Sequence, residues 1–207
     1  MVGAILTQSA AWGNVEKGIG NLAAAGALSP AAIKQLPLEK LAQLIYPCGY
    51  YNAKAHKLKA LAQRLGDGYG DKLDDLFRLS LDSLRRELLS IHGIGQETAD
   101  SIILYAAHKP IFVIDAYTRR ILQRLGLAPP KEDYTSYQAL FMENLSHDVS
   151  LFNEYHALLV RHGKDTCRKV PLCSGCSLRH QCPYGLQILS GTATAPASGE
   201  SRPPARH

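Results

Sequence analysis

The chain has 207 residues, of which 46% are hydrophobic, and a net charge of +5. This length and composition allow a buried core in one or two domains, and no apolar run approaches the ~18 residues of a membrane span. The sequence also opens without a secretory signal, so the five cysteines indicate a reducing compartment, the cytoplasm.

The N-terminal residues 2–6 already form an apolar helix face, and no capping residue precedes it. A domain normally begins with an exposed approach, so we expect the chain to be a shortened form of a longer protein. Apolar residues recur at helical spacing along most of the remaining chain, and strand signals are almost absent. The sequence therefore predicts an all-α fold. Helices outside the motifs described below are expected over 14–25, 38–46, 53–65, 135–145 and 150–162.

A tight turn, Gly93-Ile94-Gly95, separates two amphipathic helical segments within the stretch 81–107. Glycines at these positions permit a turn that a Cβ would obstruct, and Gly95 leads directly into a helix N-terminus. The free N–H groups of a helix N-terminus favour an anion, so the turn can approach a DNA phosphate without reading the base sequence. An ordinary helical hairpin has the same pattern.

Four apolar residues, 111–114, give the one strand-like signal, which is too short and isolated to seed a sheet. Asp115 follows them and precedes an amphipathic helix marked by Tyr117, Ile121 and Leu125. An acid in this place is explained either as a helix N-cap or as a carboxylate at a cleft edge, tuned for chemistry by partial burial. Both interpretations stay open from these residues alone.

Four cysteines near the C-terminus follow the spacing C-x5-C-x2-C-x5-C. Zinc usually takes two separated CxxC pairs, and only the middle two cysteines form one. The asymmetric spacing fits a [4Fe-4S] cluster better, with zinc or plain buried cysteines as alternatives. The four candidate ligands are Cys167, Cys173, Cys176 and Cys182.

Basic residues gather in two places, after Asp115 and around the first cysteine. Either group is explained by nucleic-acid contact or by a solvated face. Arg168 and Lys169 lie between the first two cysteines, whereas Lys164 has no role that the sequence reveals. The last residues, 187–207, are rich in Ser, Ala, Pro, Thr and Gly and are expected to be disordered.

The hairpin, the acid and the cysteine tail occur in one order on one helical chain, together with Gln8 in Ile5-Leu6-Thr7-Gln8 and the segment 49–55. This combination resembles the endonuclease III-like superfamily of helix-hairpin-helix (HhH-GPD) DNA glycosylases over residues 1–186. The hairpin segment Gly93-Ile94-Gly95-Gln96-Glu97-Thr98-Ala99-Asp100, followed by Val113-Ile114-Asp115-Ala116-Tyr117, looks like the 3-methyladenine branch of this superfamily. The first cysteine gap is one residue shorter than the usual six.

The resemblance implies two helical lobes with the lesion pocket between them. One lobe would span 15–125 and contain the helix-hairpin-helix at about 81–107. The other would combine 1–14 with 126–186 and carry the cluster loop, 167–182. The implied partner is double-stranded DNA containing a damaged base, bound by a monomer associated with the nucleoid.

The resemblance also implies roles for single residues. The implied catalytic acid is Asp115, which would stabilise positive charge on the sugar or activate water. The hairpin would grip a phosphate, and the cluster loop would offer basic side chains to another. A wedge would fill the hole left by the flipped base, and an amide would touch the orphaned partner base. The residues implied for the phosphate-binding hairpin are Gly93, Ile94 and Gly95, and those for the basic side chains of the cluster loop are Arg168 and Lys169. The implied wedge is Tyr50, and the implied amide is that of Gln8.

Glu97 departs from the bifunctional members, which carry a lysine nucleophile at this position. Because a carboxylate cannot form a Schiff base, we expect a monofunctional glycosylase that uses water. An alkylated, cationic purine would suit the charge of Glu97, the second candidate catalytic residue, and the aromatic rings of Trp12, Tyr50 and Tyr51. Two alternatives remain. One is an endonuclease III-type lyase for oxidised pyrimidines, with Lys164 or Lys54 as the amine, and the other is a non-catalytic DNA-binding protein.

Overall fold

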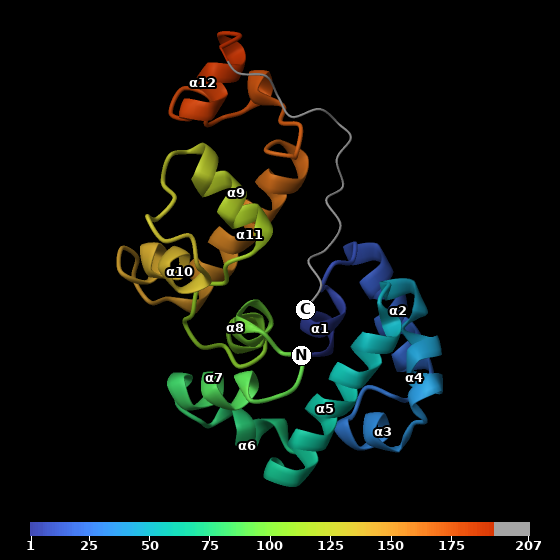
Figure 1. The fold of residues 1–207 in the computed structure, drawn as a ribbon. Coiled ribbons are helices and arrows are strands. Elements are labelled where there is room, and N and C mark those ends of the chain that lie inside the picture. Colours follow the sequence, from blue (N-terminus) through green and yellow to red (C-terminus); the bar gives the residue numbers. More distant parts are fainter. Residues whose placement is uncertain (193–207) are drawn as a thin grey trace. The chain divides into compact units, whose positions relative to one another are not determined.

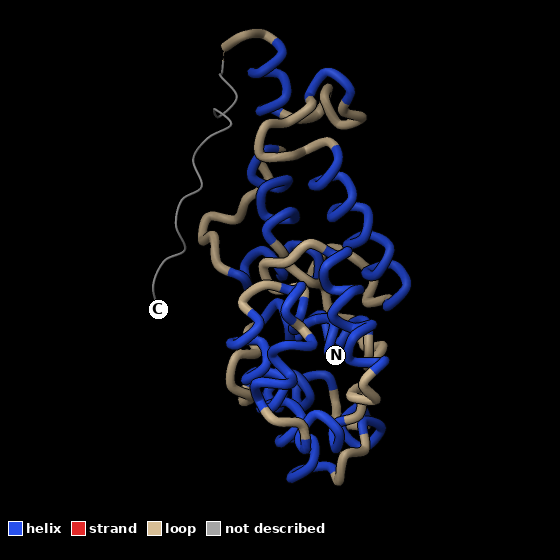
Figure 2. Tube along the Cα trace, turned by 90° about the vertical axis from the view of Figure 1, so that its right-hand side faces the viewer, coloured by secondary structure: helices blue, strands red, loops and turns tan. Residues whose placement is uncertain are grey.

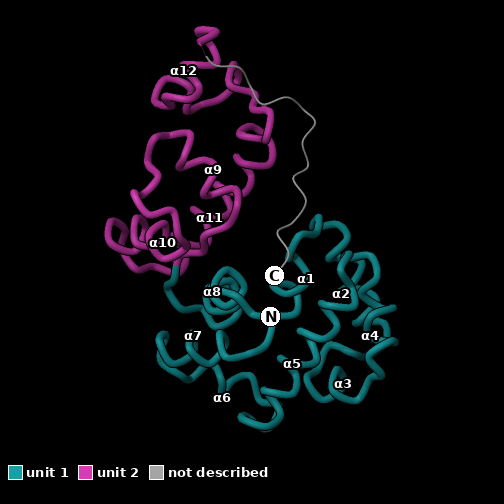
Figure 3. The backbone as a smooth tube through the Cα atoms, viewed as in Figure 1, with its two compact units in different colours: residues 1–111 teal, residues 112–207 magenta. Residues whose placement is uncertain are grey.

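The computed structural model describes residues 1–192, and these residues contain helices and loops but no strand (Figures 1 and 2). The chain divides into two compact units, residues 1–111 and residues 112 onward (Figure 3). Of the helices within residues 1–192, none is long and apolar enough to cross a lipid bilayer.

The first unit is organised around the long helix α5 (Tyr51–Tyr69). Its apolar face carries Leu58, Leu61 and Leu65, all buried, at the spacing that places residues on one side of a helix. Four helices and a short 3-10 turn pack around α5. They are α1 (Val2–Leu6), α3 (Pro30–Gln35), α4 (Leu38–Leu44), α6 (Leu73–Phe77) and η1 (Tyr46–Cys48).

The remaining helices of this unit are α2, α7 and α8. Helix α2 (Trp12–Ala24) packs against α1, α4 and η1, and α7 (Leu81–Leu89) pairs with α8 (Gln96–Tyr105). The α1 helix contacts α8 as well as α2 and α5, and its Ile5 and Leu6 are fully buried. This burial explains why the structure keeps residues 1–14 in the first unit, whereas the sequence prediction assigned them to the second.

The second unit contains α9 (Ala116–Arg124), α10 (Tyr134–Met142), α11 (Val149–Asp165), η2 (Cys173–Gly175) and α12 (Pro183–Leu189). Its core is aromatic: the Phe112 ring stacks on Phe141 with centroids 3.7 Å apart and meets Phe152 edge-on at 5.4 Å. Helix α9 packs against α11, so the unit begins at Phe112 rather than at the predicted residue 126.

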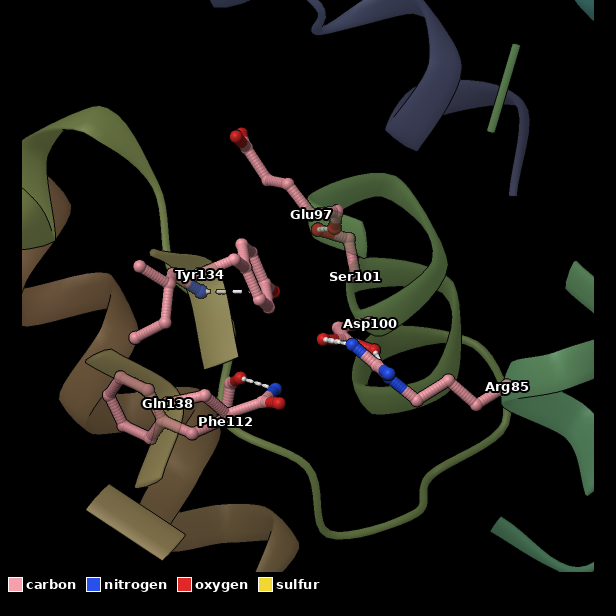
Figure 4. A network of polar contacts seen from close by, with 8 residues as sticks. Arg85, Glu97, Asp100, Ser101, Phe112, Tyr134 and Gln138 are labelled. Atoms are coloured by element: carbon pink, nitrogen blue, oxygen red, sulfur yellow. Dashed lines mark hydrogen bonds and ion pairs between the residues drawn. The ribbon is translucent and has the colours of Figure 1, made fainter. Parts of the chain in front are cut away.

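The apolar stretch 111–114 is buried but forms no strand. Side chains of α10 satisfy its backbone instead: the Gln138 amide donates to the Phe112 carbonyl at 2.6 Å, and the Ile114 N–H donates to the Tyr134 hydroxyl at 3.3 Å (Figure 4). Buried backbone groups need partners, and here they find them without a sheet.

The C-terminal segment is more ordered than expected at its start. Helix α12 continues to Leu189, so the predicted tail at 187–207 is wrong for its first residues. Pro183 at the first helical position and the Cys182 sulfur, which accepts the Gly185 N–H at 3.3 Å, begin this helix. The rest of the predicted tail, 193–207, lies outside the described residues.

Candidate nucleic-acid interface and catalytic site

The hairpin between α7 and α8 has the geometry that its glycines require. Gly93 has φ +82°, a left-handed conformation that side chains with a Cβ rarely adopt. Gly95 is exposed and caps α8 without a side chain, so no Cβ shields the first N–H groups of that helix. Ile94 is only 5% exposed, and its N–H bonds to the Ile91 carbonyl. The Ile94 side chain therefore anchors the turn in the core, and the glycine backbone forms its outer surface.

An ion pair between a partly exposed arginine and a buried carboxylate joins the two hairpin helices (Figure 4). Arg85 on α7 donates from Nε and Nη2 to the two carboxylate oxygens of Asp100 on α8, at 2.7 and 3.2 Å. The Asp100 side chain is fully buried. A two-point contact of this kind restricts the orientation of the two side chains as well as pairing their charges. It therefore helps to fix how α7 and α8 are oriented on either side of the glycine turn.

Glu97 lies in the first turn of α8 and is exposed. Its carboxylate projects away from the helix in Figure 4, and its backbone carbonyl accepts the Ser101 hydroxyl at 2.7 Å. A carboxylate in the first turn of a helix is also favourable for the helix dipole. The position predicted for a lysine nucleophile in bifunctional relatives therefore carries an exposed acid.

Gln8 and Tyr50 lie on two loops of the first unit. The Gln8 amide nitrogen donates to the Thr98 hydroxyl at 2.7 Å, and its oxygen accepts the Lys57 ammonium at 2.5 Å. Tyr50 precedes α5 with φ +46° and is 67% exposed. A left-handed tyrosine costs about 1 kcal/mol or more, so the fold maintains a strained backbone to hold this ring in solvent.

The two aromatic residues predicted to line a substrate pocket differ in their surroundings. Trp12 is 57% exposed, and its indole N–H donates to Glu16 at 2.8 Å. Tyr51 is half-buried, and its ring lies 4.9 Å from that of Tyr46. Trp12 is accessible to a ligand, whereas Tyr51 is partly occupied in packing.

Lys54, one of the two amines considered for a lyase, is buried inside the first unit with 2% exposure. Its ammonium donates to the carbonyls of Leu6 at 2.9 Å and Cys48 at 2.7 Å. Burial lowers the pKa of Lys54. The position is inaccessible to a sugar without local unfolding, so Lys54 is not an available nucleophile. Lys164, the other amine considered, is exposed in the last turn of α11.

Asp115 begins α9 in the second unit, and the structure confirms its role as a helix cap. One carboxylate oxygen accepts the Thr118 N–H at 2.7 Å, and the other lies 3.6 Å from Nε2 of His156 on α11. Burial alone would raise the pKa of Asp115, but the contacts from His156 and the Thr118 N–H outweigh burial and lower it. The group is therefore ionised at neutral pH.

His156 is the residue that the sequence reasoning missed. It is 8% exposed and also lies edge-on to the Phe112 ring. The only sequence signal was its place on the apolar face of the predicted helix 150–162, four residues after Phe152. A histidine with that spacing is usually an ordinary core residue. Its contact with Asp115 could therefore be found only from the three-dimensional structure.

The four cysteines line one hollow of the second unit, with a space of ≈ 390 Å³ including the part open to solvent. All four are half-buried. Within residues 1–192, no group of three or more His, Cys, Asp or Glu side chains converges to hold a single metal ion. Burial, followed by the charges of the other three cysteines, raises the pKa of Cys173, and Arg124 opposes these effects.

Two arginines of α9 bind the segment that carries the four cysteines, residues 167–182, here called the cysteine loop. Arg124 donates to the Cys167 sulfur at 3.2 Å and to the carbonyls of Arg168 and Lys169 at 2.6 and 2.9 Å. Arg120 donates to the carbonyls of Cys167 and Gly163 at 2.9 and 2.7 Å. The basic cluster after Asp115 is thus largely structural, whereas the Arg168 and Lys169 side chains are exposed.

Comparison with known proteins adds an independent finding. Residues 2–147 match the model of the family described as "HhH-GPD superfamily base excision DNA repair protein". The matched region contains the hairpin and Asp115 but ends before the first cysteine of the loop.

Two relatives with known names show how far the similarity extends. The "Putative DNA repair glycosylase MJ1434" of Methanocaldococcus jannaschii is 44% identical over 88% of this chain and 83% of its own length. Endonuclease III of Sulfolobus acidocaldarius is 32% identical over 79% of this chain and 71% of its own.

Solved structures give the same picture. The Helicobacter pylori 3-methyladenine DNA glycosylase bound to 1,N6-ethenoadenine aligns with a TM-score of 0.68 and 29% identity, over 79% of this chain and 82% of that one. A non-covalent endonuclease III–DNA complex aligns with a TM-score of 0.79 and 24% identity, over 91% and 84%, which shows a shared fold.

Proposed function

Because the chain belongs to the HhH-GPD superfamily of base excision DNA repair proteins, we propose that it is a monofunctional glycosylase for an alkylated purine such as 3-methyladenine. That the chain is a DNA repair glycosylase, and hence an enzyme, follows from the family and the relatives. The reaction type rests on one observation, the exposed carboxylate of Glu97 in the first turn of α8.

The absence of an amine at Glu97 supports hydrolysis by water. A lyase needs a lysine to attack the sugar, and a carboxylate cannot replace it. The buried position of Lys54 removes one of the two substitutes considered. The similarity to a 3-methyladenine DNA glycosylase solved with 1,N6-ethenoadenine supports the substrate class, and the negative charge of Glu97 would attract a cationic base.

Asp115 is the proposed catalytic residue, and its environment favours one of the two roles open to an acid. A general base works best when its pKa lies near the operating pH, whereas the pKa of Asp115 lies below its ordinary value. A permanently ionised carboxylate is better suited to stabilise positive charge on the sugar as the glycosidic bond breaks. His156 is the proposed positioning residue, because its Nε2 lies 3.6 Å from one carboxylate oxygen while the Thr118 N–H donates to the other.

The proposed DNA contacts come from both units. In the first, the backbone of Gly93, Ile94 and Gly95 would bind phosphate, Tyr50 would serve as the wedge, and Gln8 would meet the orphaned base. In the second, the exposed side chains of Arg168 and Lys169 would neutralise phosphate. We propose that the protein acts as a monomer on duplex DNA.

The cysteine loop is proposed to hold a [4Fe-4S] cluster through Cys167, Cys173, Cys176 and Cys182. The donor set fits, because all four thiols line one hollow, and the Arg124 guanidinium and the Gly185 N–H each lie beside a sulfur that would be a thiolate. When bound, such a cluster would fix the shape of the loop that carries Arg168 and Lys169. Iron and sulfide should each approach about four atoms per chain; stoichiometric zinc without iron in anaerobically prepared protein would contradict the cluster.

A panel of duplexes tests the substrate. Each duplex carries one lesion: 3-methyladenine, 7-methylguanine, thymine glycol, uracil or a mismatched adenine. Release of the free base is measured directly, with Asp115→Asn as the inactive control. We expect release of an alkylated purine and little release from the thymine glycol duplex. Preferential release of thymine glycol would favour the endonuclease III-type alternative, and binding without release of any base would favour a non-catalytic protein.

A further inference from the structure

Lys57 on α5 determines how the Gln8 amide is oriented. The Lys57 ammonium can only donate hydrogen bonds, so the atom of Gln8 that lies 2.5 Å from it is the amide oxygen. The amide NH2 then faces the Thr98 hydroxyl, 2.7 Å away, on a residue that is 5% exposed. A flipped amide would place its NH2 against the ammonium, so the flip is unfavourable.

The same lysine also lies against the hairpin. A Cβ built on Gly93 would meet the Lys57 stem at 2.4 Å, so the aliphatic part of Lys57 packs directly on this glycine. One side chain therefore contacts both the proposed phosphate-binding turn and the Gln8 amide. Its stem packs on the turn, and its charge binds the amide.

Lys54, one turn earlier on α5, fixes the backbone of the two loops near Lys57. Its ammonium binds the carbonyls of Leu6 and Cys48, each two residues before a proposed DNA-contacting residue, Gln8 or Tyr50. The loop that carries Gln8 is thus anchored by a buried charge. With the backbone fixed, Gln8 can still change its side-chain conformation, including a flip of its amide. The hydrogen bond from Lys57 restricts this flip.

We propose that Lys57 is a specificity-determining positioning residue: by locking the Gln8 amide in one orientation, it lets the enzyme discriminate among the bases opposite the lesion. This inference rests on the proposed function, in which Gln8 meets the orphaned base. A freely flipping amide presents either a donor or an acceptor and so adapts to any base edge. A locked amide presents one pattern, and bases with the opposite pattern bind less well.

The test measures binding of the full-length protein to duplexes that contain a stable abasic analogue opposite A, C, G or T. Lys57→Met keeps the stem that packs on Gly93 and removes the ammonium, whereas Lys57→Arg keeps a group that can only donate. Lys40→Met makes the same chemical change at an exposed position on α4 and serves as the matched control. Thermal unfolding of each variant shows that it is folded.

We expect Lys57→Met to reduce the ratio of Kd values between the worst and best partner bases by about fivefold to tenfold, the range of one net hydrogen bond. Lys57→Arg should retain most of the ratio, and Lys40→Met all of it. Gln8→Ala should abolish the discrimination, and adding Lys57→Met to Gln8→Ala should not change the ratio further.

Two results would overturn the inference. An equal loss of affinity for all four partners in Lys57→Met would make Lys57 a plain phosphate or packing contact. An unchanged ratio in Gln8→Ala would mean that Gln8 does not read the base. Because these measurements need no excision, they are separate from the lesion panel: discrimination that depends on Lys57, without release of an alkylated purine, would support this inference and refute the proposed substrate.

Discussion

The two units hold the loops that carry the proposed site residues in similar ways, but the surroundings that support these loops differ. In the first unit, the buried Lys54 of α5 binds the carbonyls of Leu6 and Cys48, which precede Gln8 and Tyr50, and Lys57 binds the Gln8 side chain. In the second, arginines of α9 bind the carbonyls and a sulfur of the cysteine loop. Between residues 166 and 184 no side chain is buried, so this loop lacks an apolar core of its own.

This difference implies different sources of order. The loops of the first unit are positioned by the protein alone, through buried hydrogen bonds and packing. The cysteine loop has half-buried thiols around a hollow and depends on the arginines and, as proposed, on a bound cluster. We therefore expect changes at the cysteine loop to alter cofactor content and local order, while the hairpin and the Gln8 loop remain intact.

The largest effect is expected from Asp115→Asn. The change removes the charge but retains a good N-cap for α9, so the fold should be preserved while excision falls by about 10²-fold or more. Single-turnover release of the base measures the loss, and binding to an abasic analogue should change little. Near-normal turnover would show that Asp115 is only a helix cap.

Arg124→Met tests the support of the cysteine loop. It removes the hydrogen bonds to Cys167, Arg168 and Lys169, and we expect retention of iron to fall by about tenfold or more on dilution with a chelator. Hydrogen exchange should accelerate in residues 166–182 and stay unchanged in the first unit. Arg161→Met, at an 82% exposed position of α11, is the matched control. Full retention of iron and sulfide in Arg124→Met would contradict this account.

His156→Gln should have a smaller effect, concentrated at low pH. Without His156, the pKa of Asp115 should rise, because burial alone raises it. The carboxylate contributes stability above its unfolded pKa of about 3.9 and loses that contribution as the pH falls through its lower folded pKa. In His156→Gln this loss should begin at higher pH.

The measurement is the pH dependence of kcat/KM and of unfolding. We expect the acid limb of the rate profile to move to higher pH, with a change of only a few-fold at neutral pH. His147→Gln, at an exposed position, should leave the profile in place. An unmoved acid limb in His156→Gln would mean that His156 does not position Asp115.

The all-helical fold and the ranges of most helices could be predicted from the sequence, because the spacing of apolar residues indicates which face of a helix is buried. It did not locate the boundary between the units, since Ile5 and Leu6 look the same in sequence whichever unit buries them. Short helices such as α3 and α6 were missed because one or two turns give too little periodicity.

The candidate site divides in a similar way. Glycine turns, cysteine spacing and Asp115 are local signals, so the sequence alone singled them out as candidates. His156 beside Asp115, Lys57 on Gln8 and Arg124 on Cys167 join residues separated by more than 40 positions. Such pairs come from tertiary packing, and a histidine, lysine or arginine at helical spacing does not reveal its partner.

The central claim, monofunctional excision without a lysine at position 97, is tested most directly by borohydride trapping. The unmodified protein is incubated with its substrate duplex and borohydride, and a parallel sample is analysed with and without alkali. We expect base release, strand breaks only after alkali and no covalent protein–DNA adduct, while Glu97→Lys yields weak trapping. Efficient trapping by the unmodified chain, with strand breaks in the absence of alkali, would contradict the claim and identify a lyase whose amine lies elsewhere, with Lys164 the first to replace.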